Sequence, residues 1–128
     1  MSIKDPDVIV ELHDSLVGGF GGESGLLSKH LLISALSRPF LGLSDGTELY
    51  PTIVEKASAL LHSLVKNHAF LDGNKRTAGV VTLDFLLEYG FELKYEQKEF
   101  IDFILGIARN EIDFDHIKDW ITHRISKI

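Results

Sequence analysis

One short segment, residues 68–77 with the sequence HAFLDGNKRT, concentrates side chains that could act on an anionic substrate. His68 is a candidate general base, because the imidazole of an ordinary histidine can take a proton from a hydroxyl near neutral pH. Asp72 has the chemistry of a magnesium ligand, since Mg²⁺ binds one or two carboxylates together with phosphate oxygens. Lys75 and Arg76 add positive charge to the first turn of an expected helix, where the helix dipole alone favours acidic residues. This inversion predicts that a strongly anionic group, such as a phosphate, binds there.

Two residues between the carboxylate and the cations support the same interpretation. Gly73 allows the backbone to approach a ligand closely, and Asn74 is a suitable N-cap for the helix. Each residue also has an ordinary structural explanation. His68 could cap the end of the preceding helix, Asp72 and Gly73 form a common turn pair, and the two cations could be a solvated surface pair. A cavity is favoured for the cations, because the helix that they begin is apolar for most of its length.

Composition limits the class of protein. A chain of 128 residues is long enough for one domain with a real core. Its net charge of −6 argues against broad binding to nucleic acid or anionic membranes, although it allows a local cationic pocket. The absence of cysteine excludes disulfides, thiolate metal sites and cysteine nucleophiles. The N-terminal residues lack the apolar core of a secretion signal and no apolar run reaches membrane-spanning length, so a cytoplasmic protein is expected.

The spacing of apolar residues is helical along almost the whole chain. Asp5 with Pro6 after it, Ser28 and Asp113 are suitable starts for three helices, and Pro51 is expected to open a longer one. The inward faces expected for the first and the last helix are, respectively, Ile9, Leu12 and Leu16, and Ile117, Trp120, Ile121 and Ile125.

The helix expected over residues 74–89 is apolar on nearly every face, which is typical of a helix in the middle of a bundle. Gly90 is a natural end for it. The strand candidates are two short pieces, residues 91–93 and 47–50. The expected fold class is therefore all-α: a compact single domain over residues 1–128, built as a helical bundle around this buried central helix.

The segment 68–76 resembles the signature of the Fic/Doc family, His-x-Phe-x-(Asp/Glu)-Gly-Asn-(Gly/Lys)-Arg. The matching residues, in order and at the same spacing, are His68, Phe70, Asp72, Gly73, Asn74, Lys75 and Arg76. The similarity extends to residues 12–14 and 35–39 and to the helix that leads into the motif. All of these resemble the short, single-domain Doc-like (death-on-curing) toxins of toxin–antitoxin pairs, so the resemblance implies a Fic/Doc-like fold.

Two departures from the AMP-transferring members of the family indicate the Doc branch. Those members typically carry Gly where this chain has Lys75, and a second Arg where it has Gly79. A lysine side chain would occupy room that a glycine leaves for one placement of the phosphates. The resemblance to the Doc branch implies that ATP binds in the reversed sense and that its γ-phosphate is transferred to a protein hydroxyl.

The family's motif implies that His68 is the base for the target hydroxyl and that Asp72 is the Mg²⁺ ligand. The residues implied to bind the phosphates of ATP are Gly73, Asn74, Lys75 and Arg76. The family also has a flap that holds the target peptide by strand addition. Residues 43–50 are the candidate flap here, with an ordinary surface loop as the alternative.

The resemblance also implies partners. They are a protein substrate of the translation elongation factor class, whose modification causes growth arrest, and a cognate antitoxin encoded beside the toxin. No direct binding to nucleic acid or to a membrane is expected. Two alternative functions stay open: transfer of AMP to a protein, and catalytically silent binding of a nucleotide or peptide, in which His68 and Asp72 are only structural.

Overall fold

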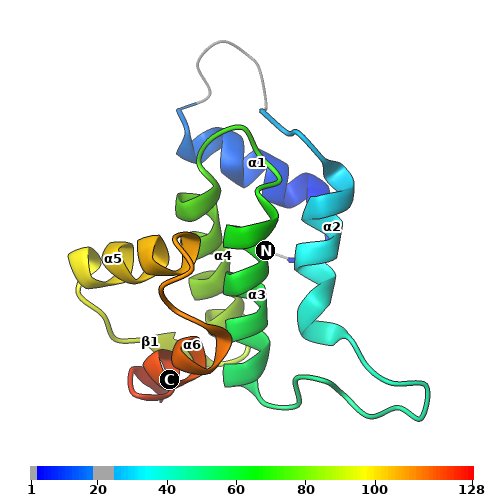
Figure 1. Cartoon of the computed structure of the whole chain (residues 1–128), viewed down its shortest axis with the longest axis vertical. Coiled ribbons are helices and arrows are strands. Elements are labelled where there is room, and N and C mark those ends of the chain that lie inside the picture. The colour runs from blue at the N-terminus through cyan, green and yellow to red at the C-terminus, as the bar shows by residue number, and fades with distance from the viewer. Residues whose placement is uncertain (1–2, 19–24) are drawn as a thin grey trace.

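The computed structural model of the chain describes residues 3–18 and 25–128. The elements within these residues are α1 (Pro6–Leu16), α2 (Lys29–Ser37), a 3₁₀ turn η1 (Arg38–Phe40), α3 (Ile53–Asn67), α4 (Asn74–Glu88), β1 (Phe91–Leu93), α5 (Gln97–Ala108), α6 (Phe114–Thr122) and β2 (Ile125–Lys127). Helices dominate the described part, as Figure 1 shows, so the all-α prediction is confirmed.

The helix starts follow from local capping chemistry. The Asp5 carboxylate accepts a hydrogen bond from the N–H of Asp7, and Pro6 occupies the first turn of α1. The hydroxyl of Ser28 caps α2, and the carboxylate of Asp113 caps α6. These three predicted starts are confirmed.

The start of α3 differs slightly from the prediction. The helix begins at Ile53 and not at Pro51, because Thr52 acts as its N-cap. The Thr52 hydroxyl accepts a hydrogen bond from the N–H of Glu55 at 3.1 Å and donates one to its carboxylate at 2.9 Å. This reciprocal cap sets the first helical residue more strongly than the proline before it.

The core forms around α3 and α4, which pack against each other. α3 also contacts α2, α5 and α6, and α4 contacts α1 and α5. Ala78, Val81, Phe85 and Leu86 of α4 are fully buried. The expected central helix is therefore confirmed, since neighbouring elements cover several of its apolar faces, although Leu87 is 52% exposed.

The C-terminal end differs from the prediction. α6 stops at Thr122, and Ile125 lies in β2, which pairs antiparallel with β1 with Leu93 opposite Ile125. Placing Ile125 on the last helical face was therefore wrong. The strand prediction for 91–93 is confirmed, whereas residues 47–50 form no strand and contribute only the isolated bridge between Gly42 and Glu48.

α3 separates the candidate flap from the motif. Residues 43–50 precede the start of α3, and His68 follows its end. A helix of 15 residues is about 22 Å long at ~1.5 Å per residue. The two segments therefore lie at opposite ends of α3 (Figure 1). A flap role for 43–50 stays a prediction.

No helix among the described residues combines the length and the apolar character that crossing a bilayer requires.

Candidate active site

The junction between α3 and α4 turns sharply at two residues with positive φ. His68 is the C-cap of α3 and has φ 52° and ψ 52°, the left-handed conformation that residues other than glycine rarely adopt. Gly73, with φ 77°, is the N-cap of α4. The loop between them is therefore short, and it brings the end of one core helix to the start of the next.

The side chain of Asn74 holds this loop closed. Its Oδ1 accepts a hydrogen bond from the N–H of Phe70 at 3.0 Å, and its Nδ2 donates one to the carbonyl of Phe70 at 2.8 Å. Both residues are buried. The expectation that Asn74 is the N-cap was wrong: Gly73 takes that position, and Asn74 is the first helical residue. Its amide is occupied within the loop, so an anion would meet Asn74 through its backbone.

A second segment lies alongside the motif loop. The N–H groups of Leu27 and Ser28 donate to the carbonyl of Ala69 at 2.8 and 3.2 Å, and the N–H of Leu71 donates to the carbonyl of Gly25 at 2.7 Å. The glycine-rich stretch 18–25 between α1 and α2 lies largely outside the described residues. Its end at Gly25, however, is held directly against the motif.

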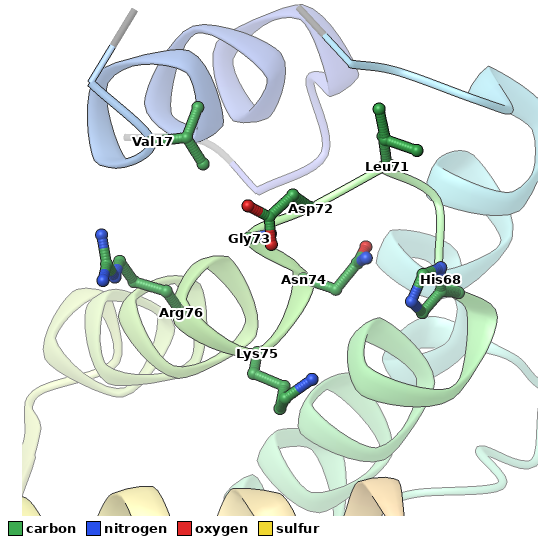
Figure 2. A pocket seen from close by; sticks show the side chains of 8 residues that line it. All are labelled: Val17, His68, Leu71, Asp72, Gly73, Asn74, Lys75 and Arg76. Carbon is green, nitrogen blue, oxygen red and sulfur yellow. The ribbon is translucent and has the colours of Figure 1, made fainter.

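A pocket of about 330 Å³ opens at this junction (Figure 2). Its lining residues are Val17, His68, Leu71, Asp72, Gly73, Asn74, Lys75 and Arg76. The structure thus brings together all six residues singled out for chemistry. Figure 2 shows His68 on one side and Arg76 on the other, with Asp72 between them. The volume is in the range of small-molecule sites, roughly 300–1,000 Å³.

The charged groups of the pocket are partly held by the protein. Arg76 Nη1 donates to the carbonyl of Leu16, the last residue of α1, at 2.8 Å, so it caps that helix and keeps other guanidinium donors for a ligand. Asp72 Oδ1 accepts from the N–H of Gly73 at 2.8 Å. Lys75 leaves the first turn of α4 in a different direction from Arg76 (Figure 2). The pocket therefore combines one exposed carboxylate with two cations at a helix N-terminus.

The donor set fits Mg²⁺ only together with phosphate. In the described part of the chain, no cluster of three or more His, Asp or Glu side chains could hold a metal by itself. Asp72 is a lone carboxylate beside two cations, and Mg²⁺ typically takes one or two protein carboxylates and completes its coordination with phosphate oxygens and water. Asp72 is accordingly suited to a metal–nucleotide complex and not to a free ion.

Sequence reasoning missed His13. It is 2% exposed, its Nε2 lies 2.6 Å from the carbonyl oxygen of Asp72, and its ring stacks on that of Phe70 with centroids 3.7 Å apart. The signal was present, because His13 is one helical turn after the fully buried Ile9. Counting only apolar residues along α1 assigned that inner face to Leu12, which is only half-buried.

Gly79 faces away from the pocket. A Cβ at this position would lie 3.1 Å from Ile104 Cδ1 and 3.4 Å from Phe100 Cε2, both on α5. This chain has glycine where the AMP-transferring members have their second arginine. Because the position is packed against α5, it leaves little space for any side chain.

Comparison with known proteins agrees with this geometry. The model of the Fic/DOC family matches residues 4–86, more than half of the chain. The chain is 36% identical over 113 residues to Toxin Doc of Mycolicibacterium smegmatis, which covers 84% of this chain and 86% of that protein. It is 27% identical over 116 residues to Protein kinase doc of Escherichia phage P1, with 89% and 88% covered. The chain belongs to the Fic/Doc family, and within it resembles the Doc toxins.

Proposed function

We propose that this chain is a Doc-type toxin that transfers the γ-phosphate of ATP to a hydroxyl of a protein target. The observation that carries the proposal is the pocket itself, in which His68, Asp72 and Arg76 surround the N-terminus of α4. Phosphoryl transfer depends mainly on positioning and on neutralising charge. A base, a carboxylate for a metal and cations on a helix N-terminus supply both.

In the proposed reaction, His68 takes the proton of the target hydroxyl as its oxygen attacks the γ-phosphorus. A phosphorus–oxygen bond to the target forms, the bond to the oxygen bridging the β- and γ-phosphorus breaks, and ADP leaves. The N–H groups after Gly73, together with Lys75 and Arg76, bind the phosphates. Asp72 would hold Mg²⁺, which supplies neutralisation of phosphate charge when bound.

Transfer of AMP is the second candidate, since it uses the same base and the same helix N-terminus. Two observations disfavour it. Lys75 replaces the glycine of the AMP-transferring members, and Gly79 replaces their second arginine at a position packed against α5. The relative named Protein kinase doc supports transfer of phosphate. Silent binding of a nucleotide or peptide is the third candidate, and it predicts no labelled product at all.

Labelling with α-³²P-ATP and γ-³²P-ATP in a bacterial lysate separates the three candidates. We expect a protein band labelled from γ only, lost in His68→Ala and kept in His30→Ala, a control at an exposed histidine outside the pocket. A band labelled from α would replace the proposal with AMP transfer. Equal labelling by wild type and His68→Ala would refute the role of His68.

The biological setting is part of the same proposal. The target is a translation elongation factor, modified in the cytoplasm, and the outcome is growth arrest that a cognate antitoxin relieves. Induced expression in bacteria should therefore stop growth for wild type and not for His68→Ala. Mass spectrometry of the labelled band tests the target class, and a phosphorylated protein outside translation would overturn it.

A further inference from the structure

We propose that His13 is a positioning residue, which holds the backbone of the motif loop so that Asp72 and Gly73 face the anionic ligand. Its effect on transfer rests on the proposed function, whereas its effect on the loop does not. His13 lies on α1, and the loop that it contacts is 59 residues further along the chain. α1 therefore supports the pocket through this side chain.

The first support is a hydrogen bond inside the protein. His13 Nε2 lies 2.6 Å from the Asp72 carbonyl oxygen. A carbonyl oxygen only accepts, so Nε2 is the donor. On the other side of the ring, Nδ1 lies 3.1 Å from Asp14 Oδ1, a contact that is attractive when both ring nitrogens carry protons. Because His13 is almost fully buried, water competes little for this bond.

The second support is the stack on Phe70. The two rings are 3.7 Å apart between centroids and 8° from parallel. The backbone of Phe70 is held from the other direction by the Asn74 side chain. His13 thus holds the loop at two points, the ring of Phe70 and the carbonyl of Asp72. The peptide unit that joins Asp72 to Gly73 has its orientation set by these contacts.

The third support is the space that the glycines leave. A Cβ at Gly73 would lie 3.3 Å from His13 Nε2 and 2.5 Å from Val17 Cγ1. A Cβ at Gly25 would lie 3.8 Å from His13 Cε1. The absence of a Cβ at Gly73 therefore lets the motif backbone approach the imidazole closely, whereas a Cβ at Gly25 would make only an ordinary contact with it. A buried histidine with this arrangement acts on the pocket through the loop and not by touching the ligand.

Two substitutions separate the hydrogen bond from the ring. His13→Phe keeps an aromatic ring against Phe70 and removes the donor, whereas His13→Gln restores a donor without the ring. Ile9→Ala is the matched control, since Ile9 is fully buried one turn earlier on the same helix. The measurements are hydrogen exchange of the amides of residues 69–74 and of α4, and the KM and kcat for ATP with Mg²⁺ in the γ-label assay.

For His13→Phe we expect faster exchange in residues 69–74 with little change in α4, and a loss in kcat/KM of roughly tenfold to a hundredfold, typical of residues that orient a ligand-binding group. His13→Gln should recover part of both effects. Unchanged loop exchange in His13→Phe, or the same pattern in Ile9→Ala, would overturn the proposal. If wild type transfers no phosphate, the proposed function fails, and the exchange measurement alone still decides whether His13 positions the loop.

Discussion

The buried amide of Asn74 offers the sharpest test of how the motif loop is built. Its two hydrogen bonds to the backbone of Phe70, at 3.0 and 2.8 Å, are the contacts that close the loop. Asn74→Ala removes both partners at once and leaves a buried N–H and a buried carbonyl unsatisfied. Asn74→Asp keeps the acceptor for the N–H but loses the donor to the carbonyl.

The expected magnitude follows from those two groups. Each buried polar group left without a partner costs about 1–3 kcal/mol. With some relaxation of the loop, Asn74→Ala should lower the free energy of unfolding by about 3 kcal/mol, or the midpoint of thermal unfolding by roughly 12 °C at ~4 °C per kcal/mol. A domain with a typical stability of about 5–15 kcal/mol stays folded after such a loss.

Asn74→Asp should also change how stability depends on pH, in a direction that a general destabilisation would not produce. The carboxylate places a second oxygen opposite the carbonyl of Phe70, and both are acceptors. Protonation of the introduced carboxyl supplies an O–H donor to that carbonyl. The folded state of this variant therefore binds a proton more readily than its unfolded state, so its deficit relative to wild type should shrink as pH falls from about 7 to about 4.

Urea denaturation followed by circular dichroism, at several pH values and with wild type measured in parallel, is the assay. A loss of unfolding free energy below about 0.5 kcal/mol for Asn74→Ala is the size typical of surface substitutions. Such a result would refute the role of the two buried hydrogen bonds between Asn74 and Phe70. A deficit for Asn74→Asp that grows toward acid pH would refute the assignment of the amide nitrogen to the carbonyl of Phe70.

Three further predictions follow from the structure. Gly73→Ala should lower the free energy of unfolding by at least about 2 kcal/mol and abolish labelling of the target from γ-³²P-ATP, because φ is 77° and the new Cβ would lie 2.5 Å from Val17. Gly90→Ala is the control: its φ is 86° but the space around it is open, so it should lose less stability in the same urea titration. The contribution of His62 to stability should fall below about pH 6.5, because burial and then nearby positive charge lower its pKa, so the unfolded chain takes up the proton first. The difference in unfolding free energy between wild type and His62→Gln should therefore change across that pH range, and a constant difference would contradict this cause. Gly79→Arg should lower the free energy of unfolding by more than about 3 kcal/mol and give no product labelled from α-³²P-ATP, because its side chain would enter the contact with α5. A stable variant that transfers AMP would contradict the conclusion that position 79 faces α5 and not the pocket.

Most helix boundaries could be predicted because the information is local. A capping side chain acts on an N–H two or three residues away, so Asp5, Ser28 and Asp113 mark their helices without knowledge of the rest of the fold. The grouping of the candidate site residues could be predicted for the same reason. His68, Asp72, Lys75 and Arg76 lie within nine residues of the sequence, so one turn between two helices is enough to gather them.

The tertiary structure decided features whose partners are distant in the sequence. Ile125 suits a helix or a strand, and it became a strand residue because Leu93 lies beside it. Residues 43–50 were placed at the far end of α3 by the direction of that helix.

The sequence by itself determined which candidate residues line the pocket, since their types and spacing are local properties. Only the tertiary structure decided what holds them in place. His13 and Asp72 are 59 residues apart, and nothing in the local pattern of α1 predicts their hydrogen bond. Most buried polar side chains in folded proteins are hydrogen-bonded, and for His13 the motif loop supplies the acceptor.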